Sequence, residues 1–219
     1  TTSAKDLVGN AFATDTSSSG FATVNPNVGT GAGASLWVTA FTVSCNTLYA
    51  GGSFTNFGGQ SRNYLASIDL LTGSTTSWNP NPNAQPSAIA ISGSTVYVGG
   101  AFTTINGGTT RNYIAAVDAS TGTATSWNPN STGGVNSIII SGNTVFVGGN
   151  FGNIGGQART NIAALDTTSG TATSWAPGNT GAAVYGLTLS NSTLYVTGSF
   201  AMLGGTARTK IGSLNASTG

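Results

Sequence analysis

Histidine and glutamate are both missing from this chain of 219 residues, which carries 6 lysines and arginines against 5 aspartates. Charged residues make up 5% of it, far below the quarter that is usual in globular domains. Without histidine, neither a Ser-His-Asp triad nor an imidazole metal site can form within the chain. The formal net charge of +1 gives no basic surface, so we expect no nucleic acid partner.

Cysteine occurs once, at Cys45, so no disulfide can form within the chain. We expect Cys45 to be buried as a small hydrophobic residue rather than to act as a reactive thiol. No apolar run approaches the roughly 18 residues that a membrane helix needs, so we expect no membrane insertion. The chain begins at Thr1 and is rich in Ser, Thr, Asn and Gly, which fits a secreted protein without its leader, or a trimmed chain. We therefore expect an extracellular or cell-surface location.

A motif of about 49 residues occurs four times and covers most of the chain. Its most regular part is a glycine pair between aromatic residues, in LYAGGSF, VYVGGAF, VFVGGNF and LYVTGSF at 48–54, 96–102, 145–151 and 194–200. Each copy continues with an arginine-to-aspartate segment, at 62–69, 111–118, 159–166 and, with asparagine at its end, 208–215. Self-similarity at this period is the signature of a repeat architecture.

Short strands joined by tight turns account for each copy. Ile89 and Ile91 alternate with alanines, a period of two that is typical of a strand. Ser-Gly-Ser at 92–94 favours a hairpin, and Asn-Pro-Asn at 79–81 and 128–130 ends a strand because proline cannot donate to a ladder. No stretch has a sustained period of 3.6, so we expect no substantial helix.

Four antiparallel strands in about 50 residues match the size of a propeller blade. The sequence therefore predicts an all-β fold, a β-propeller of about four kelch-like blades, each a four-stranded antiparallel sheet. Tryptophan recurs once per copy, at Trp78, Trp127 and Trp175, and we expect it in the apolar layer between blades. A β-solenoid is the competing architecture, disfavoured because the turns are of the hairpin type.

The stretch VYVGGAFTTINGGTTRNYIAAVDASTGTATSWNPN at 96–130 resembles the bacterial delta-60 repeat, a kelch-like β-propeller unit. The resemblance rests on the glycine pair, the Gly-Gly before the arginine, the closing aspartate and Trp-Asn-Pro-Asn. The last copy departs from this pattern at Thr197 and Asn215. The resemblance implies secreted or cell-surface proteins and no defined catalytic activity.

The N-terminus carries an incomplete copy, because 10–27 aligns with the end of a repeat. We expect 1–20 to be an N-terminal extension with one spare strand, and 21–219 to be the propeller, with 21–25 closing the last blade. An unpaired strand edge invites pairing. A section of a larger propeller and a strand-exchanged polymer stay open as alternatives.

Most charges follow the repeat, whereas a catalytic group of residues normally breaks such symmetry. One arginine per copy could form a basic circle for an anionic ligand: Arg62, Arg111, Arg159 and Arg208. Alternatively, each donates to backbone carbonyls. The repeated aspartates suit Asx turns, and they offer neither an acid–base pair nor a calcium cluster. We therefore predict no catalytic residues, no metal and no cofactor.

The expected function is thus non-catalytic: a structural or adhesive module that self-associates through its end strands. The first alternative is a domain that binds a cell-surface glycan or protein with one loop face. The second, less favoured, is a hydrolase or lyase, which would need a pocket with a perturbed carboxylate.

Overall fold

A computed structural model describes residues 37–219, and this part of the chain consists of strands and loops without a helix. Its strands fall into four blades of one design. The first contains β1 (Val38–Ser44), β2 (Thr47–Gly52), β3 (Asn56–Phe57), β4 (Gln60–Ser61) and β5 (Leu65–Asp69). The second contains β6 (Pro86–Ser92), β7 (Thr95–Gly100), β8 (Thr104–Ile105), β9 (Thr109–Thr110) and β10 (Ile114–Asp118). The third contains β11 (Val135–Ser141), β12 (Thr144–Gly149), β13 (Asn153–Ile154), β14 (Gln157–Ala158) and β15 (Ile162–Asp166). The fourth contains β16 (Val184–Ser190), β17 (Thr193–Gly198), β18 (Met202–Leu203), β19 (Thr206–Ala207) and β20 (Ile211–Asn215).

Each blade is an antiparallel sheet in which the second strand lies between the first and the third. The connection from the second strand to the third contains a short hairpin whose two strands have two residues each, such as β8–β9. The fourth strand of the motif meets the third at one bridge, as in Val117 with Ala124 and Leu165 with Ala172. The chain is therefore a β-propeller, as the sequence predicts, and the antiparallel ladders exclude the solenoid.

The second strand of a blade is apolar on both sides, because both faces of the sheet are covered. In β7, Val96 and Val98 lie in one apolar cluster with Tyr49 and Trp78 of the first blade. Tyr97, which points to the opposite side, lies in a different cluster with Val135 of the third blade. We call the side that packs on the following blade the front face, and the side that packs on the preceding blade the back face.

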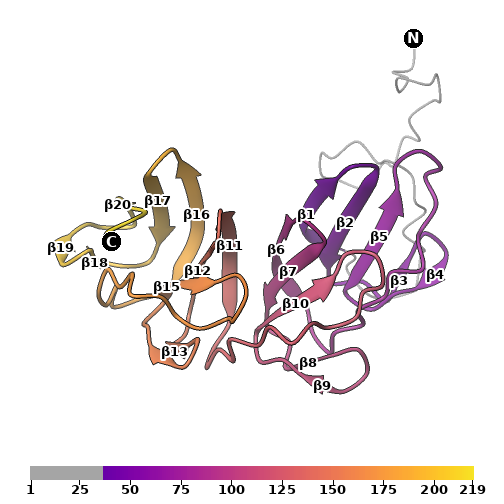
Figure 1. Cartoon of the computed structure of the whole chain (residues 1–219), viewed down its shortest axis with the longest axis horizontal. Coiled ribbons are helices and arrows are strands. Elements are labelled where there is room, and N and C mark those ends of the chain that lie inside the picture. The colour runs from indigo at the N-terminus through magenta and orange to yellow at the C-terminus, as the bar shows by residue number, and fades with distance from the viewer. Residues whose placement is uncertain (1–36) are drawn as a thin grey trace, which may run out of the picture.

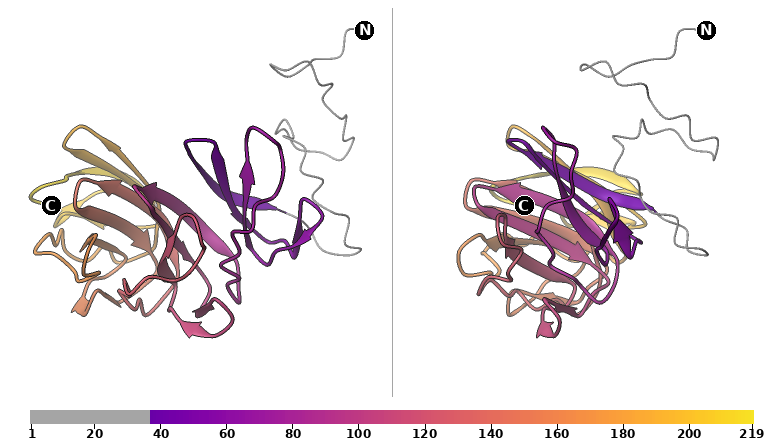
Figure 2. Two further views of the ribbon diagram at one scale, coloured as in Figure 1. Left: turned by 45° about the vertical axis from the view of Figure 1, so that its right-hand side comes forward. Right: turned by 90° about the vertical axis from the view of Figure 1, so that its right-hand side faces the viewer.

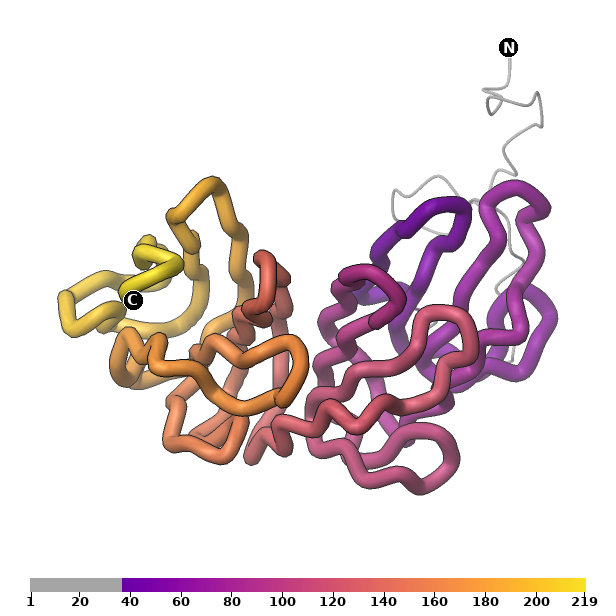
Figure 3. Tube along the Cα trace, viewed as in Figure 1, coloured from indigo at the N-terminus to yellow at the C-terminus, as the bar shows by residue number. Residues whose placement is uncertain are grey.

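The blades follow one another in chain order, and the first and fourth stand at opposite ends of the row (Figure 1; Figure 3). Successive first strands contact each other, β1 with β6, β6 with β11, and β11 with β16. Figure 2 shows the same succession after rotation, with the sheets stacked face to face. The predicted extension at 1–20 and the predicted closing strand at 21–25 lie outside the described residues.

The glycine pair at the end of the second strand has two separate causes. A Cβ at Gly100, the second glycine, would lie 2.5 Å from the carbonyl oxygen of Gln85 in the same blade. A Cβ at Gly99, the first glycine, would lie 2.4 Å from Cγ1 of Val135 in the next blade. One glycine therefore lets the blade fold, and the other lets the following blade approach.

The prediction for Cys45 is wrong, because its side chain is exposed. Cys45 occupies the turn between β1 and β2 with a φ of 51°, where the chain reverses and no neighbouring blade covers it. Position in a hairpin turn thus outweighs the general tendency of cysteine to be buried. Among residues 37–219, no helix suited to crossing a bilayer is found.

Replacing Gly99 with alanine should destabilise the fold, because the added methyl group overlaps Val135 across the junction of two blades. Overpacking of this kind costs about 1–3 kcal/mol. Gly152→Ala is the matched control, since its nearest added contact would be Thr132 Oγ1 at 3.8 Å. Urea denaturation of the two variants should give a lower midpoint for Gly99→Ala alone. Equal midpoints would contradict the packing described for this glycine.

Candidate functional site

The repeated arginines bond to the backbone of their own blades. Arg62 donates to the carbonyl of Ser61 at 2.9 Å and to that of Thr76 at 2.7 Å. Arg111 and Arg159 repeat the arrangement, with Thr125 and Thr173 as the distant acceptors. Each of these side chains therefore fastens the start of the third strand to the fourth strand of the same sheet.

Arg208 differs from the other three. Its guanidinium donates to the carbonyl of Ala207 at 3.0 Å, and its side chain is exposed. Arg62, Arg111 and Arg159 are half-buried, and each has a buried Nε without a partner in the described part of the chain. Their carbonyl bonds agree with the structural alternative, and a role in binding an anion stays a prediction.

The repeated aspartates shape the turn after the third strand. Asp118 Oδ1 accepts hydrogen bonds from the backbone N–H of Ser120 at 3.0 Å and of Thr121 at 2.8 Å. The Ser120 and Thr121 hydroxyls donate to the same oxygen, and these bonds lower the pKa of Asp118 to about 2. Asp69 and Asp166 make equivalent turns, and hydrogen bonds from turn residues lower the pKa of both. The predicted Asx turns are confirmed.

The last copy has asparagine at this position and keeps the same turn. Asn215 Oδ1 accepts from the N–H of Ser217 and of Thr218, both at 2.9 Å. An amide oxygen accepts as a carboxylate oxygen does, so the turn does not depend on charge. The departure of Asn215 from the repeat pattern therefore leaves the local structure unchanged.

The carbonyls at this turn bind the aromatic side chains of the preceding blade. Trp78 Nε1 donates to the carbonyl of Asp118 at 2.9 Å, and Tyr49 Oη donates to that of Ala119 at 2.9 Å. The two rings pack edge to face with centroids 5.1 Å apart. Burial raises the pKa of Tyr49, whose hydroxyl is the donor in this bond. We call this contact of an aromatic pair with the next turn the aromatic seam.

The aromatic seam recurs at the other two junctions. Trp127 donates to the carbonyl of Asp166 at 2.9 Å, and Trp175 to that of Asn215 at 3.1 Å. Tyr97 partners Trp127, whereas Phe146, which has no hydroxyl, partners Trp175. The tryptophans thus lie between blades, as predicted. The hydrogen bonds of the tyrosines are a finding that sequence reasoning missed, although the recurrence of Tyr49 and Tyr97 was a signal for it.

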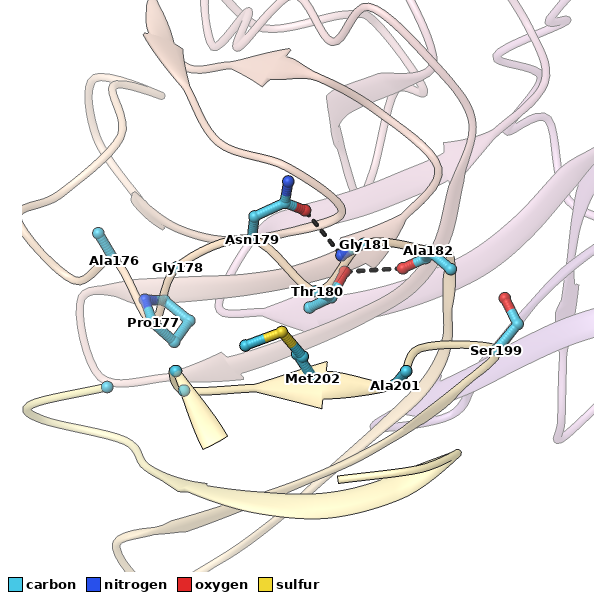
Figure 4. Close-up of a pocket in the computed structure, with 13 residues that line it drawn as sticks. Ala176, Pro177, Gly178, Asn179, Thr180, Gly181, Ala182, Ser199, Ala201 and Met202 are labelled. Carbon is cyan, nitrogen blue, oxygen red and sulfur yellow. Dashed lines mark hydrogen bonds between the residues drawn. The ribbon is translucent and has the colours of Figure 1, made fainter. Parts of the chain in front are cut away.

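The larger surface depression, about 790 Å³, lies between the 176–182 loop and the β18–β19 hairpin (Figure 4). No ionisable side chain lines it. Its polar groups bond to nearby backbone, since Asn179 Oδ1 accepts from the N–H of Gly181 and Thr180 Oγ1 donates to the carbonyl of Ala182, both at 2.7 Å. Met202 supplies the largest apolar side chain (Figure 4). This depression offers shape and apolar surface rather than acid–base chemistry.

A smaller depression of about 410 Å³ lies among the loops of the first two blades. Amides dominate its wall, and Asn63 donates to Asn81 at 2.8 Å while Asn83 donates to Thr103 at 2.9 Å. In residues 37–219 there is no group of three or more His, Cys, Asp or Glu placed to hold a metal ion.

Comparisons with known proteins agree on the fold. The profile of a family described as "Domain of unknown function (DUF5122) beta-propeller" matches residues 46–66. No curated protein matches the chain. The computationally designed Ika4 protein is 16% identical with a TM-score of 0.55, over 84% of this chain and 93% of that chain. BamB from Moraxella catarrhalis is 21% identical with a TM-score of 0.46, over 72% of this chain and 39% of that one. At these identities the structural likeness concerns the fold alone.

Replacing Asp118 with asparagine should keep the turn and lower stability at neutral pH only slightly, because Asn215 accepts the same two backbone N–H bonds without a charge. The pKa of Asp118 is lower in the folded state, so its charge stabilises the fold above the unfolded pKa near 3.8. That stabilisation is lost as the pH falls towards 2. Denaturation between about pH 5 and about pH 2 should therefore show a shallower decline in stability for the variant than for the wild type. Parallel declines would contradict this role of the carboxylate.

Proposed function

We propose that this chain is a non-catalytic β-propeller module of the delta-60, kelch-like kind, and that it serves as a structural or adhesive part of a secreted or cell-surface protein. The observation that carries the proposal is that the recurring polar side chains form hydrogen bonds to backbone groups. The arginines and aspartates of the first three blades bond to backbone within a blade, and the tryptophans bond to backbone of the next blade. Side chains that make these hydrogen bonds stabilise the fold and are poorly placed to act on a substrate.

The extracellular setting is supported by composition. Charged residues are 5% of the chain, while glycine alone contributes 33 residues and the turns are built from Ser, Thr and Asn. Hydroxyls and amides keep their hydrogen bonds without a particular ionic environment, because they carry no charge. The resemblance of 96–130 to the delta-60 repeat points to the same setting.

Binding of a glycan or a protein by one loop face is the second candidate. It is supported by the depression of about 790 Å³, whose loop departs from the repeat pattern. Ala176-Pro177-Gly178 stands where the two earlier copies have Asn-Pro-Asn. A pocket built from residues that differ between copies is what a specific ligand would require, since symmetric positions serve the scaffold first.

Protease shaving of intact producing cells tests the preferred function. Antibody against the purified chain should label the outside of the cells, and brief protease treatment should remove the label while a cytoplasmic marker stays intact. Label that persists after shaving and fractionates with the cytoplasmic marker would contradict the proposal.

A glycan array separates the second candidate from the first. We expect no ligand for the wild type, and specific binding that Met202→Trp abolishes by filling the depression would favour the second candidate instead. Leu71→Trp, a change at an exposed residue outside the depression, is the control.

A further inference from the structure

The two end faces of the described row are apolar and exposed. On the back face of the first blade, Phe41 is 58% exposed, whereas Ile89 at the same place in the second blade is 8% exposed. On the front face of the fourth blade, Ile211 is 63% exposed, whereas Ile114 is fully buried in the second blade. Burial of these positions in the inner blades comes from a neighbouring blade, so among residues 37–219 each end face lacks the neighbour that its side chains suit.

The first blade has the apolar back face and the turn carbonyls against which an aromatic seam would pack. Val38, Phe41 and Val43 stand where Pro86, Ile89 and Ile91 of the second blade meet the first. The turn after β5 has the same structure as the turn after β10, because Asp69 makes the same bonds as Asp118. The carbonyls of Asp69 and Leu70 therefore correspond to the two that bind Trp78 and Tyr49.

The front face of the fourth blade carries one of the two hydrogen-bond donors of an aromatic seam, the tyrosine. Tyr195 stands where Tyr49 and Tyr97 stand in earlier blades, yet it is 47% exposed while Tyr97 is 4% exposed. Its hydroxyl is the counterpart of those that bond across the first and second junctions. Residues 37–219 therefore carry one exposed copy of each half of an interface that recurs three times between their blades.

Thr197 lies on the front face of the fourth blade, at the position where a following blade would pack most closely. It replaces the first glycine of the pair, at which a Cβ in the first three blades would lie 2.4 to 2.7 Å from the next blade. The second glycine, Gly198, is retained, because its Cβ would overlap the carbonyl of Ala183 in its own blade. Opposite Thr197, the strand partner is Gly186, so the fourth blade accommodates the larger residue internally. Only the packing of a following blade is obstructed.

We propose that the front face of the fourth blade binds the back face of the first blade of a second copy, head to tail, through an incomplete aromatic seam that Thr197 weakens. This rests on the proposed structural function and names the partner of the end faces. Tyr195 donates to the turn of Asp69 and Leu70 of the second copy, and Ile211 packs near Phe41. Val38 of the second copy meets Thr197 where Val135 meets Gly99 inside the chain.

The interface joins two different surfaces, so it can continue from copy to copy or close into a ring. Sedimentation velocity of the full chain over a range of concentrations should show reversible association. Thr197→Gly should strengthen the association by about 5- to 150-fold, which corresponds to relief of overpacking by about 1–3 kcal/mol. In a Phe41→Lys background the same glycine change should have no effect, which assigns its action to this contact.

Mixing two blocked variants tests the head-to-tail geometry. Phe41→Lys blocks one end and Ile211→Lys blocks the other. Because both side chains are exposed, both variants should fold, and circular dichroism should give the spectrum of the wild type. Each variant alone should be monomeric, whereas the mixture should form a one-to-one dimer and nothing larger. Association of either variant alone would overturn the proposal by showing another interface.

A wild type that stays monomeric at every concentration would also overturn the proposal, whatever segment or partner covers the end faces instead. That outcome leaves the proposed function standing, because protease shaving of cells tests location independently of self-association. The two failures are therefore distinguishable.

Discussion

The packing of one sheet on the next is the constraint on which this molecule depends. Each blade has a central strand that is apolar on both sides, as Val96, Tyr97 and Val98 show, so a blade alone would leave one or both faces in water. Burial of apolar surface is the main favourable contribution to folding, and here it is gained between blades as much as within them. The blades are therefore stable as a stack, and among residues 37–219 the two end faces keep the most apolar surface exposed.

The aromatic seam links local turn chemistry to this packing. The aspartate fixes a turn, the turn presents two carbonyls, and the tryptophan and tyrosine of the preceding blade donate to them. A buried indole N–H without an acceptor would cost free energy, so the turn and the aromatic pair must occur together. This coupling gives a physical reason for the common recurrence of the turn and the aromatic pair along the chain, and it gives the repeated aspartates a structural role.

Much of the fold could be predicted from the sequence because the same pattern of strands and turns recurs in four copies of one motif. The period, the hairpin turns and the recurring Trp78, Trp127 and Trp175 specify antiparallel blades with an aromatic layer between them. The two roles of the glycine pair could not be separated in this way, since only coordinates place Gly100 against Gln85 and Gly99 against Val135. Cys45 was mispredicted because residue-type tendencies carry no information about a hairpin turn. The arginine contacts were open for a similar reason, as a cation on a repeat suits an anion and a carbonyl equally well.

A double-mutant cycle across the third junction tests the central claim most directly. A Cβ at Gly148 would lie 2.5 Å from Cγ1 of Val184 in the next blade. Gly148→Ala should therefore be destabilising in the wild type and about 1 kcal/mol or more less destabilising when Val184 is alanine, because the colliding methyl groups are gone. The same loss of unfolding free energy in both backgrounds would contradict the account, since it would mean that these glycines are not there to admit the neighbouring blade.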